Sequence, residues 1–143
     1  RVLAKKFKRS KLQRRVWNRN RYLSVSILDP IATHEQYDLF LAYQRSRHSD
    51  GDMAKMDMDD YRGLIEDSSV KTFLIEFRNS DDGKLVAICL TDCMENGLSA
   101  VYSFFDPDLK TFVAPILPEP SFVISILLKY LLKIYPLGIE PIM

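Results

Sequence analysis

The chain has 143 residues, of which 47% are hydrophobic and 27% are charged. This length fits one globular domain, and this composition excludes an intrinsically disordered or collagen-like chain. The formal net charge of +1 conceals an uneven distribution: residues 1–22 hold ten Lys and Arg without an acid, whereas residues 23–143 hold the other ten and all nineteen Asp and Glu, which leaves them at −9.

Residues 1–22, here called the basic arm, combine cations with regularly spaced apolar side chains. The apolar residues recur three to five positions apart, which predicts a helix with one apolar side. They are Leu3, Phe7, Leu12, Val16 and Trp17. Cations interleaved with the rings of Trp17 and Tyr22 are typical of RNA binding, because charge neutralises phosphates and flat rings stack on bases. A solvated tail, or an arm that docks onto a protein partner, is the alternative.

A strand and a helix are predicted next. Alternation of polar and apolar residues over residues 24–28 predicts a short strand that ends at an Asp-Pro turn. Thr33 is a good helix N-cap, and Gln36 occupies its capping-box position. Apolar residues spaced for one helical face then continue to about Arg47, where we expect the helix to end.

The following elements complete an α+β pattern. The polar residues 46–60 predict a loop that leads into a second helix over residues 57–66. Three strand-like stretches separated by two short glycine-containing turns predict an antiparallel meander. These strands cover residues 70–78, 84–92 and 98–105. We therefore expect an antiparallel-rich sheet flanked by helices.

The last strand and the residues after it have distinct patterns. Strict alternation over residues 98–105 would place Ser99 and Ser103 on one face of the strand and Tyr102 on the other. Five of the seven prolines fall in residues 115–143 and exclude regular structure where they cluster. Between them, residues 121–135 predict a helix that is apolar on nearly every side, and such a helix is expected to be buried against a sheet.

The cysteines and the apolar stretches of the sequence indicate the cellular compartment in which the protein works. Cys89 and Cys93 would lie about 13 Å apart along one straight strand, too far for a disulfide. With two histidines and no spaced ligand cluster, we expect no metal. The longest apolar-rich stretch, residues 122–135, is interrupted by serine and lysine, which argues against a signal peptide and a membrane span. A reducing, cytoplasmic setting is the expectation.

Motifs for covalent or cofactor chemistry are weak. There is no Gly-x-Ser-x-Gly elbow, and pairing of a cysteine with His34 or His48 is supported by composition alone. The five glycines are isolated, so a phosphate-binding loop for coenzyme A or a nucleotide is disfavoured. Arg47 and His48 stand beside two acids and a glycine, which makes proton transfer available, although a polar helix end followed by an acidic loop is the simpler interpretation.

Three stretches, in this order, resemble the arginyl-tRNA-protein transferase superfamily, and most closely its bacterial aspartate/glutamate leucyltransferase branch. They are residues 7–20 (Phe-Lys-Arg-Ser-Lys-Leu-Gln-Arg-Arg-Val-Trp-Asn-Arg-Asn), residues 47–53 (Arg-His-Ser-Asp-Gly-Asp-Met) and residues 92–108, which contain Gly-Leu-Ser-Ala-Val-Tyr-Ser-Phe-Phe-Asp-Pro-Asp. The resemblance covers residues 7–109, about three-quarters of the chain.

The resemblance implies transfer of leucine or arginine from aminoacyl-tRNA to the α-amine of proteins that begin with Asp or Glu, a mark for degradation in the N-degron pathway. It also implies an N-acetyltransferase-like fold without the coenzyme A loop, and aminoacyl-tRNA as co-substrate with no cofactor. We expect a monomer. An ester is an activated acyl donor and an α-amine with a pKa near 8 is partly neutral, so positioning would supply most of the rate.

On the same resemblance, three groups of site residues are expected. Four arginines would contact tRNA phosphates or clamp the acidic acceptor side chain: Arg14, Arg15, Arg19 and Arg21. The catalytic candidates are Arg47 and His48 near the acceptor amine or the ester, with Ser99 and Tyr102 shaping the cleft. Asp106 and Pro107 would form a structural turn.

Two departures from the family pattern shape the expectation for the whole chain. The family's cysteine-containing N-terminal region would precede residue 1. After residue 109, the Pro-rich run at 115–120 and the end at Met143 replace the family's Arg-Ser-Leu-Gly, long helix and Tyr-Leu-Gly-Tyr strand, so we expect a truncated or frame-altered product. We accordingly divide the chain into the basic arm and a single acyltransferase-like domain over residues 23–143, divergent after 109. A non-catalytic tRNA-binding or adaptor domain of the same fold is the alternative.

Overall fold

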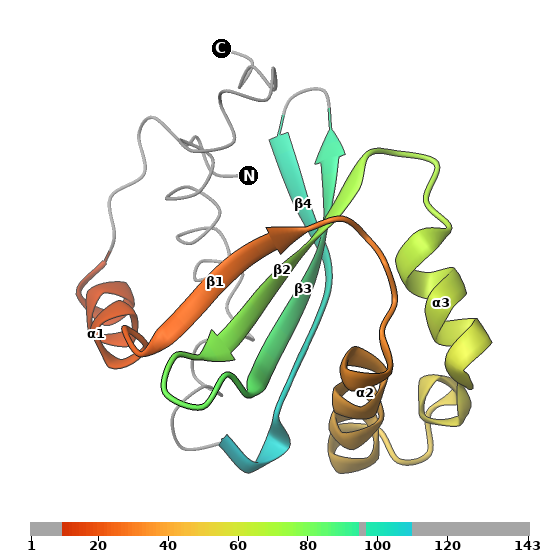
Figure 1. Ribbon diagram of the computed structural model, residues 1–143, viewed down its shortest axis with the longest axis horizontal. Coiled ribbons are helices and arrows are strands. Elements are labelled where there is room, and N and C mark those ends of the chain that lie inside the picture. The colour runs from red at the N-terminus through yellow and green to blue at the C-terminus, as the bar shows by residue number, and fades with distance from the viewer. Residues whose placement is uncertain (1–9, 95–96, 110–143) are drawn as a thin grey trace.

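A computed structural model of the chain describes residues 10–94 and 97–109, which form a four-stranded sheet with helices beside it (Figure 1). The elements in chain order are α1 (Lys11–Arg19), β1 (Leu23–Leu28), α2 (His34–Arg47), the 3₁₀ helix η2 (Asp52–Lys55), α3 (Met58–Glu66), β2 (Thr72–Asn79), β3 (Leu85–Met94), β4 (Gly97–Phe105) and the 3₁₀ helix η3 (Pro107–Leu109). Every predicted strand and helix that lies within these residues is present, with bounds that differ by only a few residues.

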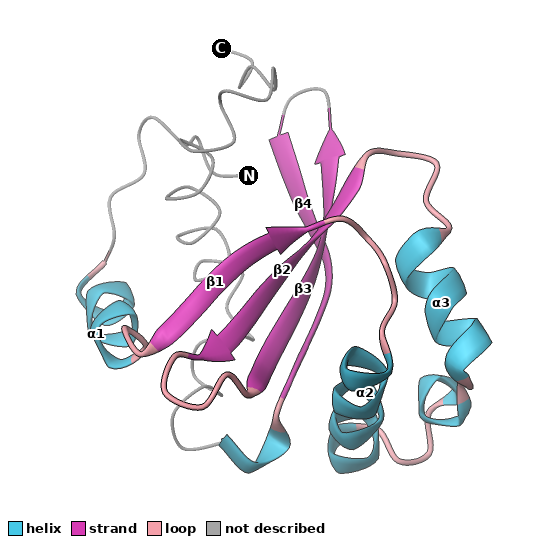
Figure 2. Cartoon of the chain, in the orientation of Figure 1, coloured by secondary structure: helices cyan, strands magenta, loops and turns pink. Residues whose placement is uncertain are grey.

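The sheet has the order β1-β2-β3-β4, and all its neighbouring strands are antiparallel (Figure 2). The predicted meander of β2, β3 and β4 is therefore confirmed. The first strand joins it across two intervening helices, with Leu28 of β1 opposite Leu74 of β2. An α+β fold with an antiparallel sheet is confirmed. The finer expectation of an N-acetyltransferase-like fold rests on the resemblance and stays a prediction.

Helices α2 and α3 both begin with reciprocal capping boxes. Thr33 accepts a hydrogen bond from the backbone N–H of Gln36, whose side chain accepts one from the Thr33 backbone N–H. Asp57 and Asp60 make the same exchange at the start of α3. Each box satisfies backbone donors that a helix N-terminus otherwise leaves unpaired. The loop predicted before α3 contains the short 3₁₀ helix η2 in addition.

The core lies between the sheet and helices α2 and α3. Phe40 of α2 is fully buried, with its ring centroid 5.1 Å from that of Tyr61 on α3 and 5.5 Å from that of Phe104 on β4. The other buried members of this cluster are Ile65, Leu74, Leu85, Ile88 and Leu90. Alternate residues of the central strands, such as Ile75 and Cys89, are buried too. The two central strands are therefore shielded from water on both faces, and α2 is fixed against β3 and β4.

A β-bulge changes which face of β4 carries which residue. The register between β3 and β4 shifts by one residue beside Val101. Ser103 lies opposite Cys89, whereas Ser99 lies opposite Asp92. Cys89 and Asp92 are three residues apart in one strand and point to opposite faces. The prediction that Ser99 and Ser103 share a face is therefore wrong, because the extra residue of a bulge reverses the alternation beyond it.

Some predicted features fall outside the described residues. These are the helix over residues 121–135, the Pro-rich run at 115–120 and the first nine residues of the basic arm. In the part of the chain that the structure describes, no helix has both the length and the apolar character that crossing a bilayer requires.

Candidate active site

Helix α2 and strand β4 lie side by side, and their contact brings together most of the polar residues that the sequence singles out. The α2–β4 interface, as we call it, consists of Tyr43, Gln44 and Arg47 from the helix and of Tyr102 and Phe105 from the strand. Gln44 and Arg47 are three residues apart and so lie on one side of α2. Each contacts a different residue of β4: Gln44 contacts Tyr102, and Arg47 contacts Phe105.

In the first of these contacts, Gln44 donates a hydrogen bond from Nε2 to the hydroxyl oxygen of Tyr102 over 2.6 Å. Gln44 is only 1% exposed, whereas Tyr102 is half-buried. Burial raises the pKa of the Tyr102 phenol, and the hydrogen bond from Gln44 only partly opposes this. The phenol therefore keeps its proton at neutral pH. Because its oxygen accepts from Gln44, its own O–H is left to donate elsewhere.

In the second contact, Arg47 stacks on the aromatic ring of Phe105 at the end of β4. Its guanidinium carbon lies 5.4 Å from the ring centroid of Phe105, within the range of a cation–π interaction. The ring of Tyr43 lies 5.0 Å from that of Phe105 and 6.4 Å from that of His48. Arg47 and His48 are exposed at the C-terminal end of α2, where the helix dipole favours cations. The interface thus places two exposed groups, the guanidinium of Arg47 and the imidazole of His48, beside the rings of Phe105 and Tyr43.

Ser99 is not part of this arrangement. It lies near the start of β4, opposite Asp92 and exposed, at the end of the strand away from Phe105. The bulge does place it on the same face of the strand as Tyr102, since its partner Asp92 shares a β3 face with Leu90, the partner of Tyr102. Of the four catalytic candidates, the structure therefore places Arg47 and Tyr102 in the α2–β4 interface through separate contacts, places His48 beside Tyr43, and leaves Ser99 apart.

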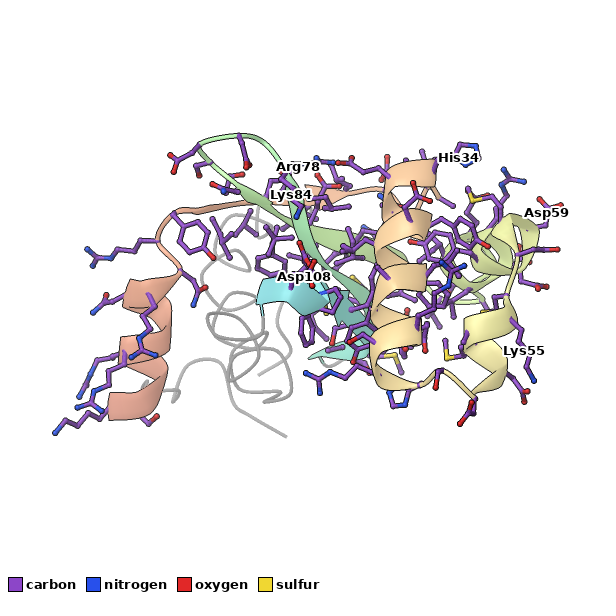
Figure 3. All side chains as sticks on the ribbon, turned by 90° about the horizontal axis from the view of Figure 1, so that it is seen from below. His34, Lys55, Asp59, Arg78, Lys84 and Asp108 are labelled. Atoms are coloured by element: carbon purple, nitrogen blue, oxygen red, sulfur yellow. The ribbon has the colours of Figure 1, made fainter. Side chains whose placement is uncertain are left out.

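Asp106 holds the turn that follows β4. Its Oδ1 accepts a hydrogen bond from the backbone N–H of Asp108 over 2.9 Å, and its Oδ2 lies 2.6 Å from Nζ of Lys84. Asp106 is 5% exposed, and its backbone N–H donates to the carbonyl oxygen of Val86. Figure 3 labels Asp108, which lies in this turn, and Lys84, the cation that pairs with Asp106. These bonds fix where β4 ends and so where Phe105 meets Arg47.

The arginines of the basic arm occupy a different place. Arg14, Arg15 and Arg19 are exposed on α1, and Arg21 is exposed just after it. Spacings of four put Lys11, Arg15 and Arg19 on one helical face. In Figure 3 the side chains of α1 carry nitrogen tips and point away from the sheet. Helix α1 lies at the start of β1, whereas α2 packs on β3 and β4 (Figure 1). The structure does not bring these arginines to the α2–β4 interface.

The part of the chain that forms the α2–β4 interface matches a family of known proteins. The family described as arginine-tRNA-protein transferase, C terminus, matches residues 35–116, more than half of the chain and all of the α2–β4 interface. The chain belongs to this family.

Relatives with a more specific name are also similar. An aspartate/glutamate leucyltransferase of Paramagnetospirillum magneticum is 51% identical over 111 residues, which cover 78% of this chain and 45% of the relative. One of Granulibacter bethesdensis is 48% identical over 109 residues, 76% of this chain and 40% of the relative. The chain thus spans less than half the length of these relatives. The resemblance of the sequence to arginyl-tRNA-protein transferases, and to their leucyltransferase branch, is confirmed.

The cysteines of this arginine-tRNA-protein transferase family member are poor nucleophiles. Burial raises the pKa of the Cys89 thiol to about 11 and also raises the pKa of Cys93. His34 lies at the exposed N-terminal end of α2 (Figure 3), whereas the thiol of Cys89 is buried and contacts Leu90 and Thr91. The thiolate, not the thiol, attacks, so these positions do not support a cysteine mechanism. Within residues 10–94 and 97–109, His, Cys, Asp and Glu form no group of three that could hold a metal ion.

Sequence reasoning missed Gln44, Tyr43 and Phe105. Gln44 carried a usable signal, since it stands four residues after Phe40 on the predicted apolar face of the helix. A polar residue on a buried face needs a hydrogen-bond partner. The partner itself, Tyr102, could not be identified, because the packing of α2 on β4 depends on the tertiary fold.

Proposed function

We propose that this chain acts in the transfer of an amino acid from aminoacyl-tRNA to the α-amine of proteins that begin with Asp or Glu. The observation that carries the proposal is the family match over residues 35–116, which contains the α2–β4 interface with a protonated, half-exposed Tyr102 and the exposed Arg47. The similar relatives are named aspartate/glutamate leucyltransferases, which favours leucine over arginine as the transferred residue. The transferred residue marks the acceptor for N-degron protein degradation.

The chemistry needs little from the protein. The ester that joins an amino acid to tRNA is already activated, and the acceptor α-amine attacks its carbonyl carbon. Arg47 suits a carboxylate, because a guanidinium binds a carboxylate through two parallel hydrogen bonds. In this proposal Arg47 contacts the acidic side chain of the acceptor, His48 lies near its amine, and Tyr102 lies near the ester. Aminoacyl-tRNA is the co-substrate and no further cofactor takes part.

The exposed cations of α1 would bind the tRNA backbone. Residues 1–22 hold no acid, whereas the rest of the chain carries −9, so a polyanion is attracted only to the arm. We therefore assign tRNA binding to the basic arm and acyl transfer to the domain that begins at residue 23. The assignment includes a monomer that works in the cytoplasm without contact to a membrane.

The arm also supports a second candidate function. Charge on α1 binds RNA whether or not chemistry occurs at the α2–β4 interface, so a non-catalytic tRNA-binding or adaptor domain fits the same helix. Consumption of aminoacyl-tRNA separates the two functions.

The test offers the purified chain radiolabelled leucyl-tRNA or arginyl-tRNA together with peptides that begin with Asp, Glu or Ala. We expect label to appear in the Asp and Glu peptides and not in the Ala peptide, and the productive tRNA names the donor. Salt-sensitive tRNA binding without transfer would establish the adaptor function instead. Absence of both transfer and binding would overturn the proposal.

A further inference from the structure

We infer that Gln44 is a positioning residue that aims the hydroxyl hydrogen of Tyr102 at the carbonyl oxygen of the aminoacyl ester. The inference rests on the proposed function and adds to it a residue, Gln44, and a role for the Tyr102 hydroxyl. It stands on one contact, the 2.6 Å hydrogen bond from Gln44 Nε2 to Tyr102 Oη.

The direction of this hydrogen bond fixes the rotation of the phenol. A tyrosine hydroxyl has one hydrogen, which turns about the C–O bond to suit its surroundings. Gln44 presents an N–H to the oxygen, so the hydroxyl hydrogen must point to another group. Because Gln44 is 1% exposed and sits within α2, its amide has little freedom to move away. The free hydroxyl hydrogen is therefore held in one orientation before any ligand arrives.

Neighbouring tyrosines show why this hydroxyl is suited to a ligand. The hydroxyl of Tyr37 already donates to the backbone carbonyl oxygen of Met56 over 2.8 Å. The side chain of Tyr61 is fully buried and out of reach of a ligand. Tyr102 differs from Tyr61 in being only half-buried, and it differs from Tyr37 in that its hydroxyl oxygen accepts a hydrogen bond, which leaves its own hydrogen to donate. The ring of Tyr102 lies beside those of Phe40 and Phe104, with centroid-to-centroid distances of 6.4 Å and 6.3 Å.

The step that Tyr102 assists balances without any further reactant. The amine nitrogen attacks the ester carbonyl carbon, and the carbonyl π electrons move to oxygen. Tyr102 donates a hydrogen bond to that oxygen and keeps its proton. The intermediate collapses, the bond to the ribose oxygen breaks, and the proton lost by nitrogen goes to the ribose oxygen. The products are an amide and deacylated tRNA. A fixed donor at this oxygen stabilises the transition state because it needs no reorientation when charge develops.

The closing experiment is a double-mutant cycle on the full chain with Tyr102→Phe and Gln44→Met. Loss of one such donor lowers kcat about 100-fold, which we expect for Tyr102→Phe, together with a rise in KM for aminoacyl-tRNA that is small beside the fall in kcat. Gln44→Met should lower kcat about tenfold alone and have no effect in the Tyr102→Phe background. Tyr37→Phe, which also removes one phenol hydroxyl, is the matched control and should leave kcat unchanged. A Gln44→Met effect that persists beside Tyr102→Phe would overturn the inference, as would a change confined to KM.

Binding of a non-reactive analogue separates this inference from the proposed function. Leucyl-tRNA with an amide in place of its ester keeps the carbonyl oxygen but does not transfer its amino acid. The wild-type chain should bind the analogue more tightly than deacylated tRNA, and Tyr102→Phe should remove the difference. If the wild-type chain distinguishes the two RNAs and Tyr102→Phe still does, the inference fails and the proposed function stands. If the wild-type chain binds neither RNA, both fail.

Discussion

Arg78 of β2 holds Glu35 of α2 through two parallel hydrogen bonds, from Nη1 to Oε1 over 3.0 Å and from Nη2 to Oε2 over 2.6 Å. The same guanidinium donates from Nε to Glu76 and from Nη1 to the carbonyl oxygen of Gly83. Arg78 (labelled in Figure 3) thus ties the first turn of α2 to the β2–β3 hairpin. Since α2 also carries Gln44 and Arg47, this clamp sets the position of the α2–β4 interface.

Removal of Arg78 should therefore destabilise the fold. In Arg78→Ala the carboxylate of Glu76, whose side chain is only 9% exposed, loses the cation beside it. Leaving a buried charge unpaired lowers the free energy of unfolding by several kcal/mol, and we expect about 2–4 kcal/mol, since Arg78 itself is partly exposed. Urea unfolding measures this change. The control is Arg62→Ala, which breaks the exposed pair with Asp59 and should cost less than about 1 kcal/mol. Equal effects of the two variants would contradict the clamp.

The same clamp predicts a change in acid stability. The hydrogen bonds from Arg78 lower the pKa of Glu35 below its ordinary value. Stability from this group is present above the pKa of an unfolded Glu, about 4.3, and is lost as pH falls through the lowered folded pKa. Glu35→Gln should therefore lose less unfolding free energy than the wild-type chain between neutral pH and about pH 3.

Asp38→Asn supplies the control for this pH prediction. Asp38 is exposed on the same helix and forms no ion pair within residues 10–94 and 97–109. Its acid-induced loss should match that of the wild-type chain. A Glu35→Gln profile identical to that of Asp38→Asn would show that the ion pair with Arg78 does not contribute to acid stability.

Local signals in the sequence were sufficient to predict the elements. The capping residues Thr33 and Gln36 act within four residues of each other, and the glycine-containing turn between β2 and β3 is also short. Patterns between residues that are close in sequence can be recognised without knowledge of the tertiary fold. Helices, strands and the hairpin connections were predictable for that reason.

Features that depend on a distant partner were not predictable. The bulge at Val101 is defined by the register with β3, so strict alternation misplaced Ser99 relative to Ser103. The pairing of β1 with β2 spans two helices. Arg47 and His48 were singled out as polar neighbours of a glycine, but the stack of Arg47 on Phe105 needs the end of β4 to lie beside the end of α2. Each of these relationships joins segments that only the tertiary fold brings together.

Tyr61 offers a test of how the core tolerates a polar group. Its hydroxyl is buried and has no hydrogen-bond partner among the residues that the structure describes. An unpaired buried hydroxyl destabilises a fold, so Tyr61→Phe should leave the free energy of unfolding unchanged or raise it by up to about 1 kcal/mol. Tyr37→Phe removes a hydroxyl that donates to Met56 and should lower that free energy by about 1 kcal/mol. Chemical denaturation of both variants checks the contrast, and a larger loss for Tyr61→Phe would contradict it.

The charges of α1 should govern how tRNA binding depends on salt. Arg14, Arg15 and Arg19 are exposed, and each phosphate contact releases counterions. Replacing all three with Gln should weaken tRNA binding and flatten the slope of log K against log salt by about 2–3, since each contact contributes about 0.7–0.9. Fluorescence anisotropy with labelled tRNA, titrated at several salt concentrations, measures the slope. Circular dichroism verifies that α1 stays helical.

A matched variant separates local contact from a change in overall charge. Arg45, Lys55 and Arg62 are also exposed, but they lie on α2, η2 and α3, away from α1 (Figure 1). Replacing these three with Gln removes the same charge, so long-range attraction falls equally in both triple variants. If α1 touches the phosphates, only its own triple variant flattens the slope. Equal slopes in the two variants would mean that tRNA is drawn by net charge and that α1 makes no direct contact.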